Sequence, residues 1–276
     1  MRRILIALLA LIALLLPLAA ECEEGYEEHP MVSEGLKVYG RFYTPEGTEG
    51  PWPTVILSHG FGGTWEESKL YIPLFLERGV ACYVFDFPGG APKNQSEGSF
   101  LEMSVLTEKQ HLLNIIDEVC AMPQVDKVML LGFSQGGVVT GLAAVERAEQ
   151  IVGEVLFYPA LCISDDGHAA YGEKENIPDD PKAFWQTVGR VYFEDVWDLD
   201  LTGMVTAYDG PVLMFHGTND PAVNHSYSVR AVELFHHGEL VLLSRIGHGF
   251  AQQTVNRVFP EIVRFMDAVG LTGAEE

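Results

Sequence analysis

The feature that most constrains this fold is a serine set between glycines at the junction of an apolar strand and a helix. Residues 128–131 form an uninterrupted apolar run, as expected for a parallel strand covered on both faces. They lead into residues 132–137 (GFSQGG), and a helical pattern follows to about residue 146. A G-x-S-x-G motif in this context places the serine on a tight turn, where bulky residues two positions away would collide. The pattern predicts an exposed nucleophile at Ser134.

Strand and helix patterns alternate along the chain on both sides of this motif. Further strands are expected at residues 54–57, 81–85, 153–158, 211–215 and 240–243, and helices at residues 67–78, 104–119 and 255–269. Residues 36–43 alternate more weakly and predict an edge strand or a hairpin arm. Thr107 with Gln110 predicts a capping box at the start of one helix. The alternation predicts an α/β fold, with a mostly parallel central sheet and helices on both faces.

One long connection interrupts this alternation. About fifty residues separate two strands that a single helix could join, and such a connection inside a compact domain is usually a functional insertion. The segment is rich in carboxylates and aromatic residues, among them Trp185, Tyr192 and Trp197. We expect a small helical cap over the active site at about residues 160–207.

An acid and a histidine are expected after Ser134, because a serine hydroxyl is inert at neutral pH without a base. In folds with this serine turn the chain order is serine, then Asp or Glu, then histidine. Asp220 lies in the loop after the strand at 211–215, and His248 follows the last strand at 240–243. We expect Asp220 to orient His248, and His248 to take the proton of Ser134.

Other titratable residues compete for these roles. Asp165 or Asp166 follows the preceding strand and remains an alternative acid. His59 and His216 each precede a glycine at a strand end, where a structural ring hydrogen-bonded to nearby backbone is the expected role. No histidine pair has zinc-ligand spacing, and the four cysteines are scattered. The sequence therefore implies no metal and no cofactor.

Two backbone N–H groups are candidates for an oxyanion hole. Gln135 opens the helix after the serine, so its N–H points to where an oxyanion would form. The second donor is expected from the glycine-rich loop at residues 59–63 (HGFGG), and we assign it to Phe61. Such donors contribute roughly 3 kcal/mol each to a transition state.

The first residues resemble an export signal. Arg2 and Arg3 precede an apolar run at residues 4–16, and Ala19 and Ala20 supply a small-residue cleavage site. This pattern predicts a signal peptide at residues 1–20, a mature domain at residues 21–276, and a secreted or periplasmic protein without stable membrane association. A retained anchor is the alternative, although the run barely reaches the length that spans a bilayer.

The net charge sets limits on partners. A formal charge of -22 repels phosphate backbones and anionic lipid. Nucleic acid is therefore not an expected partner. The sequence does not predict an oligomeric state.

Several segments resemble one known family, the α/β-hydrolase esterases that include bacterial feruloyl (cinnamoyl) esterases. The resemblance spans about residues 36–269. The segments that carry it are residues 58–62 (SHGFG), 86–87 (DF), 103–108 (MSVLTE), 132–137 (GFSQGG), 189–193 (GRVYF), 208–211 (YDGP) and 216–220 (HGTND). Residues 88–92 and 160–181 depart from the family pattern, and both segments should border the pocket that holds the acyl group of the substrate.

The resemblance implies a function as well as a fold. Ser134, Asp220 and His248 match the family's triad, and Phe61 and Gln135 match its oxyanion donors. The implied activity is hydrolysis of small or aromatic carboxylic esters, including hydroxycinnamates linked to plant cell-wall polysaccharide. A serine aminopeptidase or an acyl thioesterase of the same fold is an alternative, and a non-catalytic exported binding protein is an alternative of another class.

Overall fold

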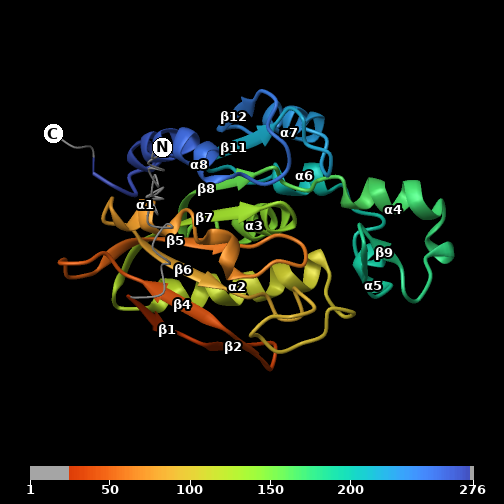
Figure 1. Cartoon of the computed structure of the whole chain (residues 1–276), viewed down its shortest axis with the longest axis horizontal. Helices are drawn as coiled ribbons and strands as arrows, with labels where there is room; N and C mark the ends of the chain where they lie inside the picture. The colour runs from red at the N-terminus through yellow and green to blue at the C-terminus, as the bar shows by residue number, and fades with distance from the viewer. Residues whose placement is uncertain (1–24, 274–276) are drawn as a thin grey trace, which may run out of the picture.

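An eight-stranded sheet runs through the middle of the molecule (Figure 1), and the computed structural model describes residues 25–273. The strands of this sheet, in spatial order, are β1 (Tyr26–Glu28), β4 (Gly40–Tyr43), β6 (Ala81–Phe85), β5 (Trp52–Ser58), β7 (Val125–Phe133), β8 (Ile151–Phe157), β11 (Val212–Gly217) and β12 (Gly238–Leu243). The pairs β1–β4 and β4–β6 are antiparallel, and all the others are parallel. The mostly parallel sheet predicted from the sequence is confirmed.

Helices cover both faces of this sheet. On one face lie α2 (Val105–Ala121) and α3 (Gln135–Glu146), and on the other α1 (Ile72–Leu76) and α8 (Gln252–Ala268). Successive residues of a strand pack into the hydrophobic cores on opposite faces of the sheet. Ile56 of β5 packs on the α2 side, and Val55 and Leu57 pack on the α8 side. Both faces are apolar because a parallel sheet with two helical layers is buried on both sides.

The segment predicted as one weak strand, residues 36–43, divides at Tyr39. Its first half, β3 (Leu36–Val38), pairs with β2 (Met31–Ser33) in a separate hairpin, while β4 joins the main sheet. The Tyr39 N–H donates to Ser96 Oγ at 2.8 Å instead of to a neighbouring strand. β1 is the edge strand on this side of the main sheet, so residues 36–38 form the predicted hairpin arm and residues 40–43 are not an edge strand.

Two predictions about helices are wrong. Residues 67–78 do not form one helix, because a 3-10 turn, η1 (Trp65–Ser68), precedes the short α1. Pro73 lies at the first turn of α1, where a missing N–H is tolerated, and it cannot continue a helix from before. The capping box of α2 uses Ser104 and Thr107, not Thr107 and Gln110.

The insertion between β8 and β11 is not purely helical. It contains α4 (Ile163–Tyr171), η2 (Lys174–Asn176), the hairpin of β9 (Lys182–Ala183) and β10 (Gln186–Thr187), α5 (Val191–Glu194) and α6 (Leu201–Val205). The helix α7 (Ser226–Val232) lies outside the insertion, after β11. The part with α4, α5 and β9 stands away from the sheet at one end of the molecule (Figure 1). We call residues 160–207 the cap.

The predicted signal peptide, residues 1–20, lies outside the described residues. Between residues 25 and 273, no helix combines the length and hydropathy needed to cross a bilayer.

One buried acid stands out within the sheet. Glu154 of β8 is completely buried, and neither of its carboxyl oxygens has a hydrogen-bond partner among residues 25–273. Burial raises the pKa of Glu154 to about 8. This side chain is therefore neutral at pH 7.

Candidate active site

Ser134 stands on a strained turn between β7 and α3, as the glycine pattern predicts. Its backbone has φ 52° and ψ −117°, a region that residues with a side chain rarely adopt. A Cβ at Gly132 would lie 2.4 Å from Gly136 O, and a Cβ at Gly136 would lie 2.2 Å from His59 O. Both glycines are required because the backbone passes within contact distance of itself. The Ser134 N–H donates to Phe157 O at 2.9 Å, which holds the turn against β8.

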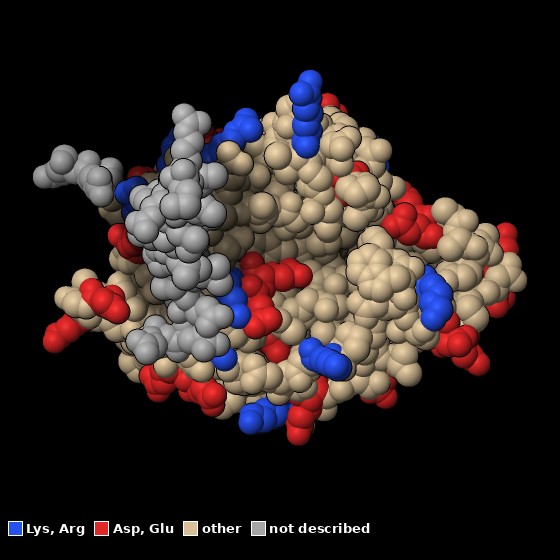
Figure 2. Space-filling view, viewed as in Figure 1, with Lys and Arg blue, Asp and Glu red and all other residues tan. Residues whose placement is uncertain are grey.

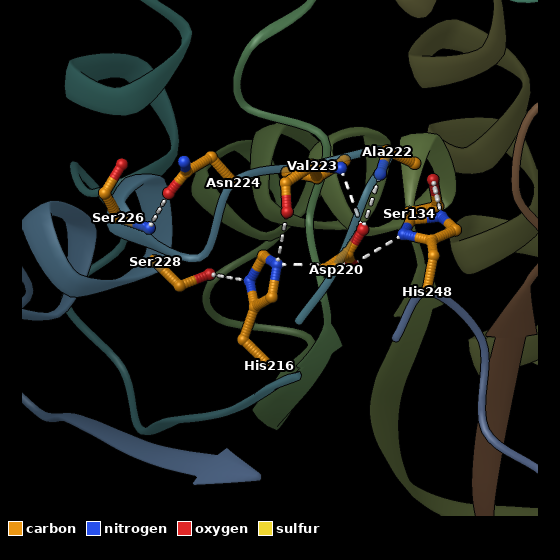
Figure 3. A network of polar contacts seen from close by, with 9 residues as sticks. All are labelled: Ser134, His216, Asp220, Ala222, Val223, Asn224, Ser226, Ser228 and His248. Carbon is orange, nitrogen blue, oxygen red and sulfur yellow. Dashed lines mark hydrogen bonds and ion pairs between the residues drawn. The ribbon is translucent and has the colours of Figure 1, made fainter. Parts of the chain in front are cut away.

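The structure brings together the three side chains that the sequence nominates (Figure 3). His248 Nε2 lies 3.0 Å from Ser134 Oγ, and His248 Nδ1 lies 2.8 Å from Asp220 Oδ2. Asp220 follows β11 and His248 follows β12, so both stand at the carboxyl ends of adjacent parallel strands. Ser134 and His248 are 114 positions apart in the sequence, and the pairing of the strands brings them into contact.

Asp220 is buried yet ionised. Its side chain has no exposed surface, and its Oδ1 accepts the N–H groups of Ala222 and Val223 at 2.8 and 2.9 Å. Burial acts to raise the pKa of Asp220, but hydrogen bonds from His216, His248 and Val223 together hold it well below its ordinary value. An ionised Asp220 requires a donor at Nδ1 of His248, which leaves Nε2 free to accept the Ser134 proton.

The two histidines expected to be structural have both ring nitrogens engaged. His216 is completely buried, and its ring contacts Val223 O at 3.0 Å and Ser228 Oγ at 2.8 Å, with Asp220 Oδ2 at 3.4 Å (Figure 3). His59 accepts the Phe87 N–H at Nε2 and contacts Gly60 O at Nδ1. The contact of His216 with Asp220 is not predictable from the sequence pattern.

The alternative acids lie elsewhere. Asp165 accepts the hydroxyl of Tyr227 at 2.5 Å. Asp166 lines a cavity under the cap. Among the described residues, the carboxylate that contacts His248 is that of Asp220.

The candidate oxyanion donors, Phe61 and Gln135, both border the cavity at Ser134. The loop that carries Phe61 approaches closely, since a Cβ at Gly60 would lie 3.1 Å from the Cβ of Ser134. Glu67, which the sequence analysis did not single out, holds this loop by accepting the Gly60 N–H at 2.8 Å. Gln135 is the first residue of α3, where helix N–H groups carry positive charge.

The side chain of Gln135 belongs to a buried polar cluster. Its Nε2 donates to Glu108 at 2.8 Å and contacts Met103 Sδ at 3.3 Å, and its Oε1 accepts the Tyr192 hydroxyl at 2.9 Å. We call Met103, Glu108, Gln135 and Tyr192 the Gln135 cluster. Tyr192 belongs to the cap, so this cluster connects the cap to the residue after Ser134. The signal in the sequence for this cluster is the position of Glu108 on α2, one turn before Leu112 on the apolar face of the helix.

Glu108 is a neutral acid at pH 7. It is buried, and its Oε1 has no hydrogen-bond partner in the described part of the chain. Burial raises the pKa of Glu108 to about 8, against the opposing effect of the Gln135 amide.

Two cavities meet at Ser134 and share Phe61, Ser134, Phe184 and Ala222. The outer pocket, of about 420 Å³, is further lined by residues that include Glu66, Glu67, Tyr158, Trp185, His248 and Phe250. The cap pocket, of about 280 Å³, is further lined by residues that include Gln135, Cys162, Asp166, Lys182, Tyr192 and Phe193. Ser134 therefore has room for one substrate group on each side.

Within residues 25–273, no group of His, Cys, Asp and Glu side chains is arranged to hold a metal ion.

The fold and the serine turn define an α/β hydrolase, and the comparison with family models agrees. The model described as "Alpha/beta hydrolase family" matches residues 55–262. The chain belongs to this family, and an esterase/lipase is among its relatives.

Individual relatives are distant. The Mycoplasma pneumoniae protein named "Putative esterase/lipase 2" is 28% identical over 104 residues, which are 38% of this chain and 37% of that protein. The chain thus matches little more than a third of the length of this relative.

Solved structures match over most of their length. The structure of Est1E from Butyrivibrio proteoclasticus with ferulic acid bound has a TM-score of 0.80 and 24% identity, covering 87% of this chain and 99% of Est1E. Mouse alpha/beta hydrolase domain-containing protein 10 has a TM-score of 0.74 and 16% identity, covering 88% and 99%. At these identities the similarity shows the fold.

Proposed function

We propose that this chain is a serine carboxylic-ester hydrolase in which Ser134, His248 and Asp220 are the catalytic triad. The observation that carries the proposal is the unbroken contact from Asp220 through His248 to Ser134 Oγ, with distances of 2.8 and 3.0 Å. A hydroxyl that only binds a ligand needs neither a base at its oxygen nor an ionised acid behind that base.

The proposed reaction is a two-step acyl transfer. His248 Nε2 takes the proton of Ser134 Oγ as this oxygen attacks the ester carbonyl, and the N–H groups of Phe61 and Gln135 stabilise the oxyanion. The imidazolium, held by Asp220, then gives its proton to the leaving alcohol. Water attacks the acyl-serine by the same route and releases the acid.

We infer that the acyl group is small or aromatic. The cap pocket is about 280 Å³ in volume and has aromatic walls at Phe184, Tyr192 and Phe193. Est1E, which has the same fold, is described with ferulic acid bound. Both observations support the aromatic class, in which feruloyl and cinnamoyl esters of plant cell-wall polysaccharide are candidates.

We further propose that residues 1–20 direct export, which places the mature enzyme outside the cytoplasm. The supporting observation is the order of two arginines, an apolar run and a small-residue site in the sequence. N-terminal sequencing of the protein purified from its natural source checks this. Cleavage near Ala20 supports export, and an intact Met1 contradicts it.

Two measurements test the catalytic proposal. A fluorophosphonate probe should label the folded protein and should fail to label Ser134→Ala. The labelled protein should hydrolyse short p-nitrophenyl esters and methyl ferulate in preference to aminoacyl amides and acyl thioesters. Absence of labelling in the folded protein would favour a binding protein, and hydrolysis of an amide without ester hydrolysis would favour a peptidase.

A further inference from the structure

We propose that the outer pocket binds the alcohol half of the ester and selects alcohols that present the flat face of a ring, as a sugar or a benzyl group does, and that carry no negative charge. This inference rests on the proposed function and names the leaving group, which the triad alone does not select.

The direction of the substrate follows from which donor borders which pocket. The leaving oxygen must receive its proton from His248, and His248 lines the outer pocket but not the cap pocket. Of the two assigned oxyanion donors, Phe61 borders both pockets and Gln135 borders only the cap pocket, so the carbonyl oxygen lies where the pockets meet and the cap pocket is left for the acyl group. An ester seated on Ser134 therefore places its acyl group under the cap and its alcohol in the outer pocket.

The walls of the outer pocket suit an apolar ring. The hairpin turn between β9 and β10 carries Phe184 and Trp185, whose exposed fractions of 52% and 83% are high for aromatic side chains. Phe184 packs its ring 5.7 Å from that of Phe61, which anchors the turn at the site. Exposed aromatic surface at the rim of a cavity marks a place where an apolar partner is bound.

The charge of the outer pocket is negative. Glu66 and Glu67 are its acidic lining residues, and no lysine or arginine is among the residues that line it. Lys69 pairs with Glu66 at 2.7 Å and offsets only one of the two carboxylates. In Figure 2 the face of the molecule is hollowed near its centre, and acidic side chains reach the edge of the hollow. An anionic alcohol would enter against this charge.

Three benzyl acetates of nearly equal size test the selection: benzyl acetate, its 4-carboxylate and its 4-trimethylammonium derivative. We expect kcat/KM at low ionic strength to be roughly five- to tenfold lower for the carboxylate than for the other two, from charge repulsion near 1 kcal/mol. The difference should shrink in 0.5 M salt, because the carboxylates are exposed. Equal kcat/KM values for the three esters would overturn the inference.

The variant Glu66→Gln tests whether the charge of the outer pocket causes the lower kcat/KM of the carboxylate ester. We expect it to reduce the penalty on the carboxylate ester two- to threefold, and Glu66→Lys to remove it. The matched control is Glu149→Gln, an exposed carboxylate beyond the far end of α3, which should leave the ratio unchanged. If Glu149→Gln changes the ratio as much as Glu66→Gln, the pocket is not the cause.

A second ester pair tests the direction of the substrate. Methyl benzoate and methyl 4-carboxybenzoate place the charge on the acyl half, so Glu66→Gln should leave their ratio unchanged. A change in this pair, with none in the benzyl acetates, would show that the acyl group occupies the outer pocket and overturn the assignment. Failure of the protein to hydrolyse any ester would contradict the proposed function instead.

Discussion

Two buried carboxyl groups act on neighbours of Ser134 and have opposite charge states. Asp220 contacts His248 and is ionised, and Glu108 contacts Gln135 and is neutral at pH 7. Neither side chain is exposed to water, although Glu108 lies deeper in the protein than Asp220.

The number of hydrogen-bond donors explains the difference. Asp220 accepts two backbone N–H groups and contacts two histidine rings, whereas Glu108 accepts one amide and leaves an oxygen without a partner. A carboxylate inside a protein keeps its charge only when donors replace the lost water. The surroundings of Asp220 thus stabilise a charge, and the Gln135 cluster disfavours one.

The largest expected effect comes from removing the charge of Asp220. Asp220→Asn should lower kcat about 10⁴-fold, because an amide presents a donor to His248 and favours the wrong tautomer. Steady-state kinetics with a p-nitrophenyl ester measures this. Asp165→Asn is the matched control and should change kcat little, because Asp165 lines neither pocket at Ser134. A loss in Asp165→Asn equal to that in Asp220→Asn would make the alternative acid the better assignment.

The next effect is on stability against pH. Glu108 and Glu154 ionise near 4.5 in the unfolded chain and near 8 in the folded one. Between these values the unfolded state has released protons that the folded state retains, so rising pH favours unfolding. The free energy of unfolding should therefore fall from about pH 5 to pH 8, by roughly 3–5 kcal/mol for each carboxyl, and then level off.

Urea unfolding at several pH values measures this slope. Glu154→Gln should flatten it without changing kcat, because Glu154 lies in β8 away from both pockets. A slope that persists unchanged in Glu108→Gln and in Glu154→Gln would show that neither group retains its proton.

The smallest effect is expected from Glu108→Gln in catalysis. An amide reproduces the shape and neutrality of a protonated carboxyl and still offers an oxygen to Gln135 Nε2, so kcat at pH 7 should stay within about threefold. Glu108→Ala leaves Gln135 without this acceptor and should reduce kcat more, with KM less affected. A large loss in Glu108→Gln would mean that Glu108 acts as a charge, and the contrast with Asp220 would fail.

The sequence predicted the parts of the site that depend on local backbone geometry. The glycines at 132 and 136 predict the serine turn, because no other residue fits at these positions. The strands that end at 217 and 243 place Asp220 and His248 at the same edge of the sheet. The parallel sheet itself follows from alternating strand and helix patterns. These features depend on near neighbours in the chain or on a general rule of topology.

The tertiary structure decided what depends on distant contacts. Glu108 lies one turn before Leu112 on the apolar face of its helix, and Glu154 lies within an apolar strand, so the sequence patterns already favour burial of both. Only the tertiary structure shows that Glu108 accepts the Gln135 amide and that neither oxygen of Glu154 has a hydrogen-bond partner among residues 25–273. The β9–β10 hairpin, in a cap expected to be helical, brings Phe184 and Trp185 to the outer pocket. A residue's chemistry in the folded protein depends on its neighbours in space, and the spacing of residues along the chain does not specify these neighbours.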